Sequence, residues 1–362
     1  MRFEALFHRI VSKDRKVHHV PVFLFLRAVS FFYGWAQTLR AWCYRAGIFR
    51  ARRLDCRTIG VGNLTLGGTG KTPMVLWIAD ALRRSGRKPA ILGRGYGGAS
   101  SAGVRVVSDG ERIVSPWATA GDEPVMMAMR LPGVPVLTGR DRYRTGRHAI
   151  RHLGADTLIL DDGYQRLDLL RDLNILLCDQ REPFGNGLTF PAGHLREPAS
   201  AARRADLICL TRCAGRTAPP EVVRAAREDC PVFFTALRLD SLLRLDDGRE
   251  ADVGTLRGRP AGAFCGIAGP ESFRKSLEEL GVRLTLFRAF PDHHPYAPED
   301  LKSLEEDARR TGAEFILTTD KDAVKLDKKA FALTALVARV KLEILDGEED
   351  FLRRLLGEAG RK

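Results

Sequence analysis

Residues 62–73, GNLTLGGTGKTP, combine glycines, a lysine and a threonine in an order that binds phosphate groups. Small residues let consecutive backbone N–H groups approach a phosphate, and a helix N-terminus placed after them adds its dipole. Lys71 would reach the terminal phosphates of a nucleotide, and the Thr72 hydroxyl would bind Mg²⁺. The segment departs from the GxxxxGK[ST] pattern because Thr65 stands at the first glycine position. We predict a phosphate-binding loop made of Thr65, Leu66, Gly67, Gly68, Thr69, Gly70, Lys71 and Thr72.

Two adjacent carboxylates end the apolar segment DTLILDD at residues 156–162. The segment indicates a short buried parallel strand, so Asp161 and Asp162 would lie at the carboxyl edge of a sheet, where nucleotides bind. Carboxylates in that place bind Mg²⁺ directly or through water. We predict both as metal residues together with Thr72, and which of the two touches the metal stays open. A plain turn after a strand is the alternative.

Two further segments carry groups that can move a proton. Residues 121–124, GDEP, place Asp122 and Glu123 before a helical stretch, where they could also serve only as N-terminal helix charges. Residues 290–296, FPDHHPY, place two adjacent histidines in a loop, and neighbours on an extended chain make a poor chelating pair. A single histidine sharing a proton with a carboxylate suits this segment better, with solvent-facing loop histidines as the alternative.

Alternating strands and helices must position these groups. Apolar strand candidates alternate with helical stretches, which predicts a mostly parallel sheet covered on both faces. A polar, Gly- and Arg-rich stretch at 241–260 indicates a linker, after which a second α/β pattern begins. The strand candidates are 58–62, 89–93, 134–138, 157–161, 173–178, 206–210, 232–237, 261–266, 283–288, 314–318 and 335–345, and the later helices are 270–280 and 298–311.

The amino-terminal stretch at residues 20–36, VPVFLFLRAVSFFYGWA, is the most apolar part of the chain. A secretory signal would need a small-residue cleavage site after it, and Arg27 interrupts a spanning helix. An interfacial helix is favoured, because aromatic side chains can enter the acyl boundary while Arg27, Arg40 and Arg45 meet anionic phosphates. A helix packed against the protein's own core is the alternative.

These patterns predict an α/β fold with a P-loop NTPase-like, mostly parallel sheet, a second, smaller α/β lobe and an amino-terminal membrane-associated helix. The expected segments are 1–50 for the amphipathic membrane segment, 51–240 for the P-loop domain, 241–260 for the linker and 261–362 for the smaller C-terminal domain.

Composition narrows the partners. The 362 residues carry 58 Lys and Arg against 45 Asp and Glu, a net charge of +13 that favours anionic partners. No Cys/His finger, RRM signature or basic zipper is present, so no nucleic acid is expected. Seven cysteines show no disulfide or zinc spacing, which indicates reduced thiols and a cytoplasmic compartment.

Eight segments in this order resemble the tetraacyldisaccharide 4'-kinase family. The resemblance runs from about residue 20 to about residue 345 and is specific, because it involves the order and spacing of all eight. The segments are VGNLTLGGTGKTP (61–73), LGRGYGG (92–98), GDEP (121–124), DDGYQ (161–165), GNGLTFPAGHLREP (185–198), CGIAGPESF (265–273), FPDHHPY (290–296) and TTDKDAVKL (318–326).

The resemblance implies transfer of the γ-phosphate from MgATP to the 4'-hydroxyl of an acylated glucosamine disaccharide 1-phosphate. The product would be lipid IVA, the bis-phosphorylated precursor of lipid A, made at the cytoplasmic face of the bacterial inner membrane by a peripheral or monotopic enzyme. It implies Asp122 as the base paired with His293, the two being brought together by closing lobes. Glu123, Arg196 and Glu197 would belong to the substrate cleft.

One position departs from the family: Arg166 stands where the family often has His, so no role for a histidine transfers to it. Two other functions stay open. A membrane-associated P-loop ATPase or nucleotide switch would also need Lys71, Thr72 and a strand-end aspartate, but it gives no reason to pair Asp122 with His293. A nucleic-acid-binding NTPase has only the net charge in its favour.

Overall fold

The computed structural model of the chain describes residues 19–95 and 103–358, and it divides into two compact units. Each unit is built from segments that are distant in sequence. The first unit comprises the described residues of Met1–Pro89, Arg142–Ala236 and Ile344–Lys362, and the second comprises those of Ala90–Asp141 and Leu237–Glu343. Residues 1–18 of the expected membrane segment and 96–98 of the LGRGYGG motif lie outside the described residues.

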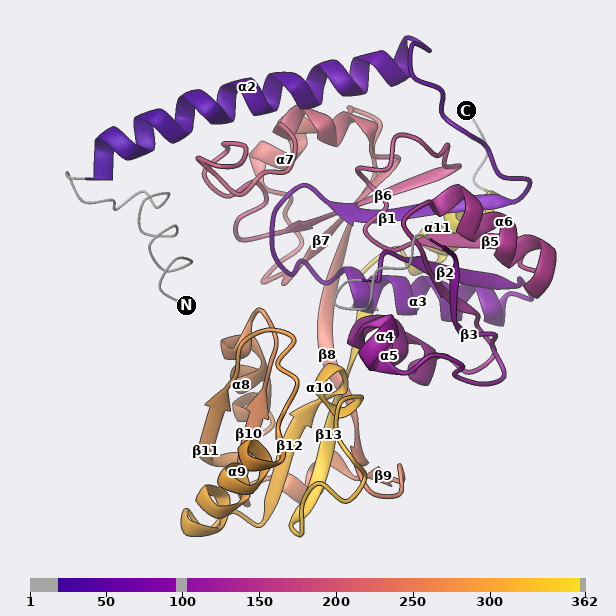
Figure 1. Cartoon of the computed structure of the whole chain (residues 1–362). Coiled ribbons are helices and arrows are strands. Elements are labelled where there is room, and N and C mark those ends of the chain that lie inside the picture. The colour runs from indigo at the N-terminus through magenta and orange to yellow at the C-terminus, as the bar shows by residue number, and fades with distance from the viewer. Residues whose placement is uncertain (1–18, 96–102, 359–362) are drawn as a thin grey trace. The chain divides into compact units, whose positions relative to one another are not determined.

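The first unit is built on a parallel sheet with the strand order β5-β1-β6-β7-β8 (Figure 1). In-register parallel pairs join these strands, for example Gly60 with Leu160 and Gly60 with Asn174. The strands are runs of mostly apolar residues buried on both faces, as expected for a covered parallel sheet. Their bounds are β1 (Arg57–Asn63), β5 (Thr157–Leu160), β6 (Leu173–Asp179), β7 (Leu207–Thr211) and β8 (Val232–Arg244), of which residues 232–236 belong to this unit.

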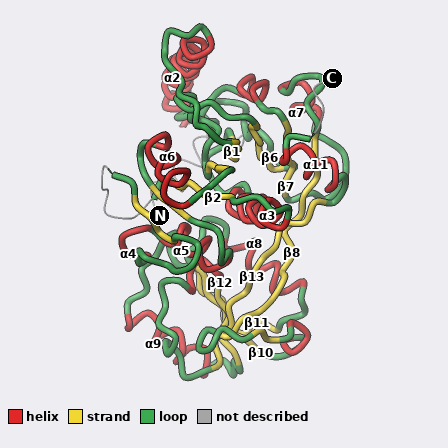
Figure 2. The backbone as a smooth tube through the Cα atoms, turned by 90° about the vertical axis from the view of Figure 1, so that its right-hand side faces the viewer, coloured by secondary structure: helices red, strands yellow, loops and turns green. Residues whose placement is uncertain are grey.

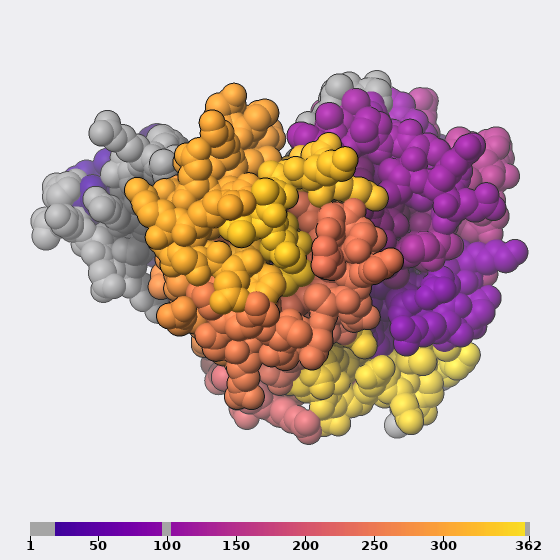
Figure 3. Space-filling model, turned by 90° about the horizontal axis from the view of Figure 1, so that it is seen from below, coloured from indigo at the N-terminus to yellow at the C-terminus, as the bar shows by residue number. Residues whose placement is uncertain are grey.

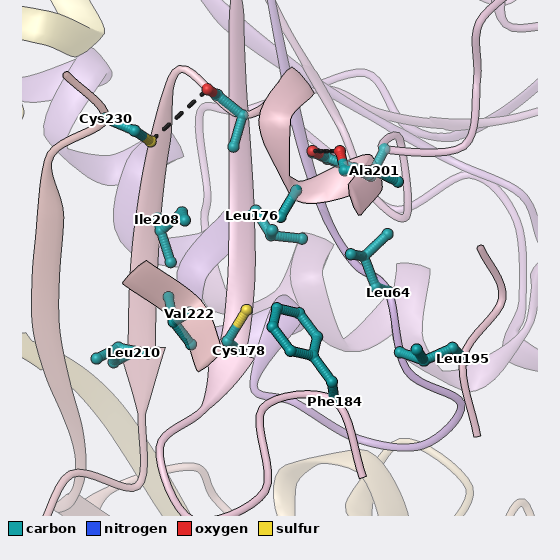
Figure 4. Packing of buried hydrophobic residues seen from close by; sticks show 13 residues of the cluster. Leu64, Leu176, Cys178, Phe184, Leu195, Ala201, Ile208, Leu210, Val222 and Cys230 are labelled. Carbon is teal, nitrogen blue, oxygen red and sulfur yellow. Dashed lines mark hydrogen bonds between the residues drawn. The ribbon is translucent and has the colours of Figure 1, made fainter. Parts of the chain in front are cut away.

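The described helices of the first unit besides the amino-terminal one are α3 (Lys71–Arg84), α6 (Arg142–Leu153), η2 (Ala199–Arg204), α7 (Pro220–Ala225) and α11 (Glu348–Leu356). Side chains of β6 and β7 pack with Leu64, Phe184 and Leu195 in one buried cluster (Figure 4). This cluster places the end of β1 and the loop at 184–198 against the same core, and those two segments carry several of the predicted site residues.

Helix α2 (Val20–Arg45) belongs to the first unit and packs on it through a small, polar face. The Ser30 hydroxyl donates to the carbonyl of Thr189 at 2.6 Å, and a Cβ at Gly34 would lie 3.2 Å from the Thr189 hydroxyl. Phe23 is buried, but most of the large apolar side chains are exposed. They include Val22, Leu24, Phe25, Phe31, Phe32, Trp35 and Trp42, with Phe31 70 % exposed. The helix thus packs against the first unit through a narrow face only, and its exposed apolar side favours the interfacial interpretation over a helix packed against the protein's own core.

The second unit has its own parallel sheet, ordered β11-β10-β12-β13, with β8 beyond β13 (Figure 2). The strands are β10 (Pro260–Cys265), β11 (Arg283–Ala289), β12 (Phe315–Thr319) and β13 (Thr334–Ile344), and a short β9 (Glu250–Ala251) pairs antiparallel with β8. The helices between them are α8 (Pro270–Glu279), α9 (Pro298–Arg310) and α10 (Asp320–Ala323). Residues 250–343 run from orange to yellow in the space-filling view of Figure 3.

Residues 90–141 also belong to the second unit. They contain β3 (Arg105–Ser108), β4 (Val136–Thr138), α4 (Trp117–Ala120) and α5 (Asp122–Arg130), while β2 (Pro89–Gly93) starts at the unit boundary. β2 pairs parallel with β4, and β3 pairs antiparallel with β4. On α5, Arg130 forms an ion pair with Asp320 at 2.6 Å and donates to the carbonyl of Val340, which fixes α5 on the second unit.

The compact units differ from the continuous segments expected from the sequence. Residues 241–260 are not a free linker, because they contain the end of β8, β9 and the turn η3 (Val253–Leu256). Leu242 and Leu256 are fully buried in the core of the second unit, a contribution that the polar composition of this stretch conceals. The C-terminal residues instead return to the first unit, where the Arg57 guanidinium donates to the carbonyls of Arg354 and Leu355.

Candidate active site

The predicted phosphate-binding loop lies between β1 and α3 in the first unit. Gly70 precedes the helix with φ 79° and Gly67 has φ 107°, both in the left-handed region that glycine adopts without strain. A Cβ at Gly67 or Gly68 would meet no atom within 4 Å, so the space beside the loop backbone is open. Lys71 donates to Oδ1 of Asn63 at 3.1 Å. The loop therefore presents a lysine and a helix N-terminus to open space, as anion binding requires.

Asp162 meets Lys71 at this loop. Its Oδ1 lies 3.6 Å from Nζ of Lys71, and Nη1 of Arg196 donates to its Oδ1 and Oδ2 at 2.9 and 2.8 Å. Burial acts to raise the pKa of Asp162, but the positive charges of Lys71 and Arg196 outweigh it, so the pKa of this carboxyl is lowered. Asp162 also has φ 53°, an uncommon conformation for a residue with a side chain. The preceding Asp161 is half-buried at the end of β5.

The loop at 184–198 supports this arrangement through its backbone. The N–H of Arg196 donates to the carbonyl of Leu64, and the N–H of Leu66 donates to the carbonyl of His194, both at 2.7 Å. Glu197 points elsewhere: it is 2 % exposed and lies 2.7 Å from Arg204. Glu197 and Arg204 line a cavity of about 770 Å³ beside α2, together with Trp35, Trp42 and Arg171. These two residues are adjacent in sequence but point to different sites. Arg196 contacts Asp162, and Glu197 lines this cavity.

The oxygen atoms near the loop suit Mg²⁺. The predicted ligands Thr72, Asp161 and Asp162 supply a hydroxyl and carboxylates, the ligand types that Mg²⁺ prefers. Within the described ranges 19–95 and 103–358 no group of three or more His, Cys, Asp or Glu residues could hold a metal. A nucleotide-linked Mg²⁺ needs no such group, because one or two carboxylates bind it and phosphates and water complete its ligands. The donor set therefore fits the ion.

A second cluster lies in the second unit around Asp122, the first residue of α5. Nδ1 of His293 lies 2.9 Å from each carboxylate oxygen of Asp122. Asp122 is 5 % exposed, whereas the His293 side chain is 43 % exposed. His293 has φ 61°, which a histidine adopts only when its surroundings impose it. The expectation that closing lobes bring these residues together is wrong, because both belong to one compact unit.

The charges in this cluster support one another. Burial acts to raise the pKa of Asp122, but the hydrogen bond with His293 and the charge of Lys321 outweigh it, so the pKa is lowered. The hydrogen bond with Asp122 raises the pKa of His293 against burial and Lys321. Asp122 is thus a carboxylate at neutral pH, and its imidazole partner protonates more readily than a free histidine. This pair can accept and share a proton.

Comparison with known proteins decides the family. A family model described as tetraacyldisaccharide-1-P 4'-kinase matches residues 22–359 of the chain. The chain belongs to the tetraacyldisaccharide-1-P 4'-kinase family. It is accordingly an ATP-dependent kinase of lipid A biosynthesis.

Individual members of the tetraacyldisaccharide 4'-kinase family agree over nearly the whole length. The chain is 44 % identical over 344 residues to the tetraacyldisaccharide 4'-kinase of Syntrophus aciditrophicus, covering 92 % of this chain and 91 % of that protein. It is 46 % identical over 305 residues to that of Geobacter metallireducens, with 84 % and 89 % covered. A crystal structure of the family member from Aquifex aeolicus in complex with ATP matches with a TM-score of 0.74 at 33 % identity, covering 91 % of this chain and 96 % of that one. These matches confirm the α/β fold and the family inferred from the motifs.

Several residues of the cluster around Asp122 were not predicted as site residues from the sequence. Lys321 lies 3.4 Å from Glu123 and 2.8 Å from Asp292, and Lys325 lies 3.8 Å from Asp122. Both lysines come from the TTDKDAVKL segment, which was noticed as a motif without any role for its residues. The available signal was the spacing of charged residues after a predicted strand at 314–318, a place where strand-end residues serve sites in α/β sheets.

The predicted residues therefore form two groups in this kinase. The first unit contains the loop Thr65–Thr72, Asp161, Asp162 and Arg196. The second unit contains Asp122, Glu123 and His293. Glu197 lies in the first unit at the cavity beside α2. At the departing position, Arg166 donates to Asp168 at 2.9 Å.

Proposed function

We propose that this chain transfers the γ-phosphate of ATP to the 4'-hydroxyl of tetraacyldisaccharide 1-phosphate, giving lipid IVA and ADP. The observation that carries the proposal is the contact of His293 with both oxygens of a buried Asp122. A phosphate-binding loop alone suits any ATPase or switch, but an ionised carboxylate paired with an imidazole suits an enzyme that must take a proton from a hydroxyl group. Family membership supplies the identity of that hydroxyl.

The phosphate-binding residues of the first unit would hold the nucleotide. The backbone of residues 65–70 and the α3 N-terminus would bind phosphate oxygens, and Lys71 would neutralise charge on the transferring group. Lys71 rests on Asn63 and beside Asp162, so its ammonium is already directed at the loop. Mg²⁺, held by Thr72, Asp161 and Asp162, would supply further stabilisation of phosphate charge.

Asp122 would act as the base. As the bond from the substrate oxygen to phosphorus forms and the bond to the ADP oxygen breaks, the hydroxyl proton passes to the carboxylate. His293, on the other side of that carboxylate, would share the proton. A low pKa keeps Asp122 ionised before the reaction, and in a loose transition state proton transfer is needed only late. Glu123 of the second unit and Arg196 and Glu197 of the first would contact the disaccharide.

Helix α2 would bring the enzyme to its lipid substrate. It is long and apolar enough to cross a membrane by length and composition, and only 17 % of its apolar window is buried. A soluble surface helix buries its apolar side, whereas α2 packs through Ser30 and Gly34 and exposes Phe25, Phe31 and Trp35. With Arg27 exposed along the same helix, α2 fits a monotopic or peripheral position at the cytoplasmic face of the inner membrane.

The test is transfer of labelled γ-phosphate from MgATP to a detergent-solubilised acylated disaccharide 1-phosphate. We expect Lys71→Ala and Asp122→Ala each to lower the transfer rate by about a hundredfold or more, while Lys88→Ala, an exposed lysine in the first unit, leaves it unchanged. ATP hydrolysis without phosphorylated lipid in the unaltered chain would instead establish the ATPase or nucleotide-switch function.

A further inference from the structure

Asp322 is a buried carboxylate in α10 with a complete set of donors. Its Oδ2 accepts from the N–H of Gly266 at 3.0 Å and from the hydroxyl of Thr319 at 2.7 Å. Its Oδ1 accepts from the hydroxyl of Tyr296 and from the ammonium of Lys325, both at 2.8 Å. Because every donor is part of the second unit and Asp322 is 0 % exposed, this carboxylate is a fixed point in the core.

Lys325 holds its charge between two carboxylates. Its side chain is 1 % exposed, and Nζ lies 2.8 Å from Asp322 and 3.8 Å from Oδ2 of Asp122. The same ammonium lies 4.8 Å from the centre of the Tyr296 ring. A buried ammonium is stable only when it is paired, and Asp322 alone provides that pairing. Lys325 therefore does not need Asp122 for its own charge balance, and its contact with Asp122 calls for a separate explanation.

The same anchor holds the segment that carries His293. The N–H of His293 donates to the carbonyl of Gly266 at 3.2 Å, and Gly266 in turn donates its own N–H to Asp322. Tyr296, three residues after His293, donates to the other oxygen of Asp322. Asp322 thus fixes Lys325 beside Asp122 on one side and the His293 segment on the other.

We propose that Lys325, held by Asp322, is a positioning residue for phosphoryl transfer that fixes the Asp122 carboxylate in its ionised form against His293. The proposal rests on the proposed function, since it assigns a role beside the proposed base. Lys325 itself gains and loses no proton in the reaction. It acts through Asp122, which takes the proton of the hydroxyl group.

Other charged groups near Asp122 are arranged differently. Lys321 is paired with Glu123 and Asp292, and its Nζ lies 3.3 Å from Nε2 of His293. It therefore faces the far side of the imidazole. Lys325 reaches Asp122 directly, with Nζ 3.8 Å from Oδ2, on the same carboxylate that His293 contacts at 2.9 Å. His293 and Lys321 lower the pKa of Asp122 against burial, and the charge of Lys325 adds a smaller lowering.

The experiment compares three variants of the full-length chain in the lipid phosphorylation assay across pH. Lys325→Met removes the charge and keeps a long side chain. The double variant Lys325→Met with Asp322→Asn removes both buried charges, so it does not leave Asp322 unpaired. Lys302→Met, at an 80 % exposed lysine on α9, is the matched control.

We expect Lys325→Met to lower kcat at least about tenfold, with the KM for ATP within about twofold, because the nucleotide loop lies in the other unit. The acidic limb of the pH profile should move upward, since an adjacent cation lowers the pKa of a carboxyl and its removal raises it again. The double variant should regain thermal stability without regaining kcat. A purely structural role would restore rate together with stability.

Recovery of full kcat in the stable double variant would overturn the proposal, as would an unshifted acidic limb in Lys325→Met. Failure of this proposal is distinguishable from failure of the proposed function. If Asp122→Ala abolishes transfer while Lys325→Met behaves like Lys302→Met, only the role of Lys325 is wrong. If Asp122→Ala retains transfer, the proposed base is wrong as well.

Discussion

A single nitrogen of Arg196, Nη1, donates to both carboxylate oxygens of Asp162, at 2.9 and 2.8 Å. Lys71 approaches the same carboxylate at 3.6 Å. Asp162 is therefore held between two cations in this state. A Mg²⁺ ion that binds Asp162 must share its oxygens with Arg196 or replace it, so the arginine and the metal compete for one carboxylate.

The lowered pKa of Asp162 predicts how stability depends on acid. A carboxyl whose pKa is lower in the folded state stabilises the fold above its ordinary pKa near 4, and that contribution is lost as the pH falls through the lowered value. We expect Asp162→Asn to reduce the loss of Tm between pH 5 and pH 3, as measured by circular dichroism. Asp80→Asn is the control. Asp80 pairs with the exposed Arg83 on the surface of α3, so this change should leave the acid dependence nearly unchanged. An unaltered acid profile in Asp162→Asn would contradict the prediction.

The raised pKa of His293 predicts the opposite dependence of stability on pH. A group whose pKa is raised by folding stabilises below its ordinary pKa, near 6.5, and that contribution is lost as the pH rises through the raised value. We expect His293→Gln to lower Tm by about 2 °C at pH 6 and by less at pH 8.5. Equal losses at both pH values would show that the effect comes from packing rather than from the charge pair.

Gly266 predicts a steric effect beside the Asp322 anchor. A Cβ there would lie 2.9 Å from the Tyr296 hydroxyl and 3.0 Å from the carbonyl of Pro291. We expect Gly266→Ala to destabilise the protein by about 1–3 kcal/mol and to lower kcat, because the segment carrying His293 must move. Gly269→Ala is the matched control, since its nearest atom would lie 3.4 Å away. Denaturant unfolding and the transfer assay measure the two effects, and equal stability of the two variants would count against this reasoning.

The exposed aromatic side of α2 predicts binding to lipid vesicles. We expect the double change Phe31→Asp and Phe32→Asp to remove most of the protein from sedimented phosphatidylglycerol-containing vesicles, while leaving Tm unchanged because both side chains are about two-thirds exposed. Val223→Asp, at a 60 % exposed valine on α7, is the control. Vesicle binding that survives in the double variant would place the lipid contact elsewhere.

The apolar runs in the sequence located most strands of both sheets within about two residues, because a buried parallel strand is a continuous apolar segment. β8 continues to Arg244, past its predicted end at residue 237, and the short strand β9 was not predicted. The short edge strand β3 was not predicted, since an antiparallel edge strand such as Arg105–Ser108 leaves little apolar signal. Leu242 and Leu256 were hidden in the same way by their polar neighbours.

The site was predictable only in part. The spacing of glycines, Lys71 and Thr72 identified the phosphate loop, since that chemistry is local in sequence. Asp122 and His293 are 171 positions apart, so no local pattern joins them, and only the resemblance to the family implied their pairing. The role of Lys325 cannot be read from the sequence alone. Its partner Asp322 is only three residues away in the chain, but its contact with Asp122 arises because residues 90–141 belong to the second unit.

The discontinuous first unit has a consequence for how the protein is made. Its last segment begins at Ile344, so the unit cannot be completed until almost the whole chain has left the ribosome. Helix α2, with its exposed phenylalanines and tryptophans, emerges first and lacks its packing partners at Thr189 and Arg196 until about 150 further residues have been synthesised. During that interval the large apolar side chains of the nascent helix lack that protein surface, so a lipid bilayer would be able to receive the helix before its own protein does.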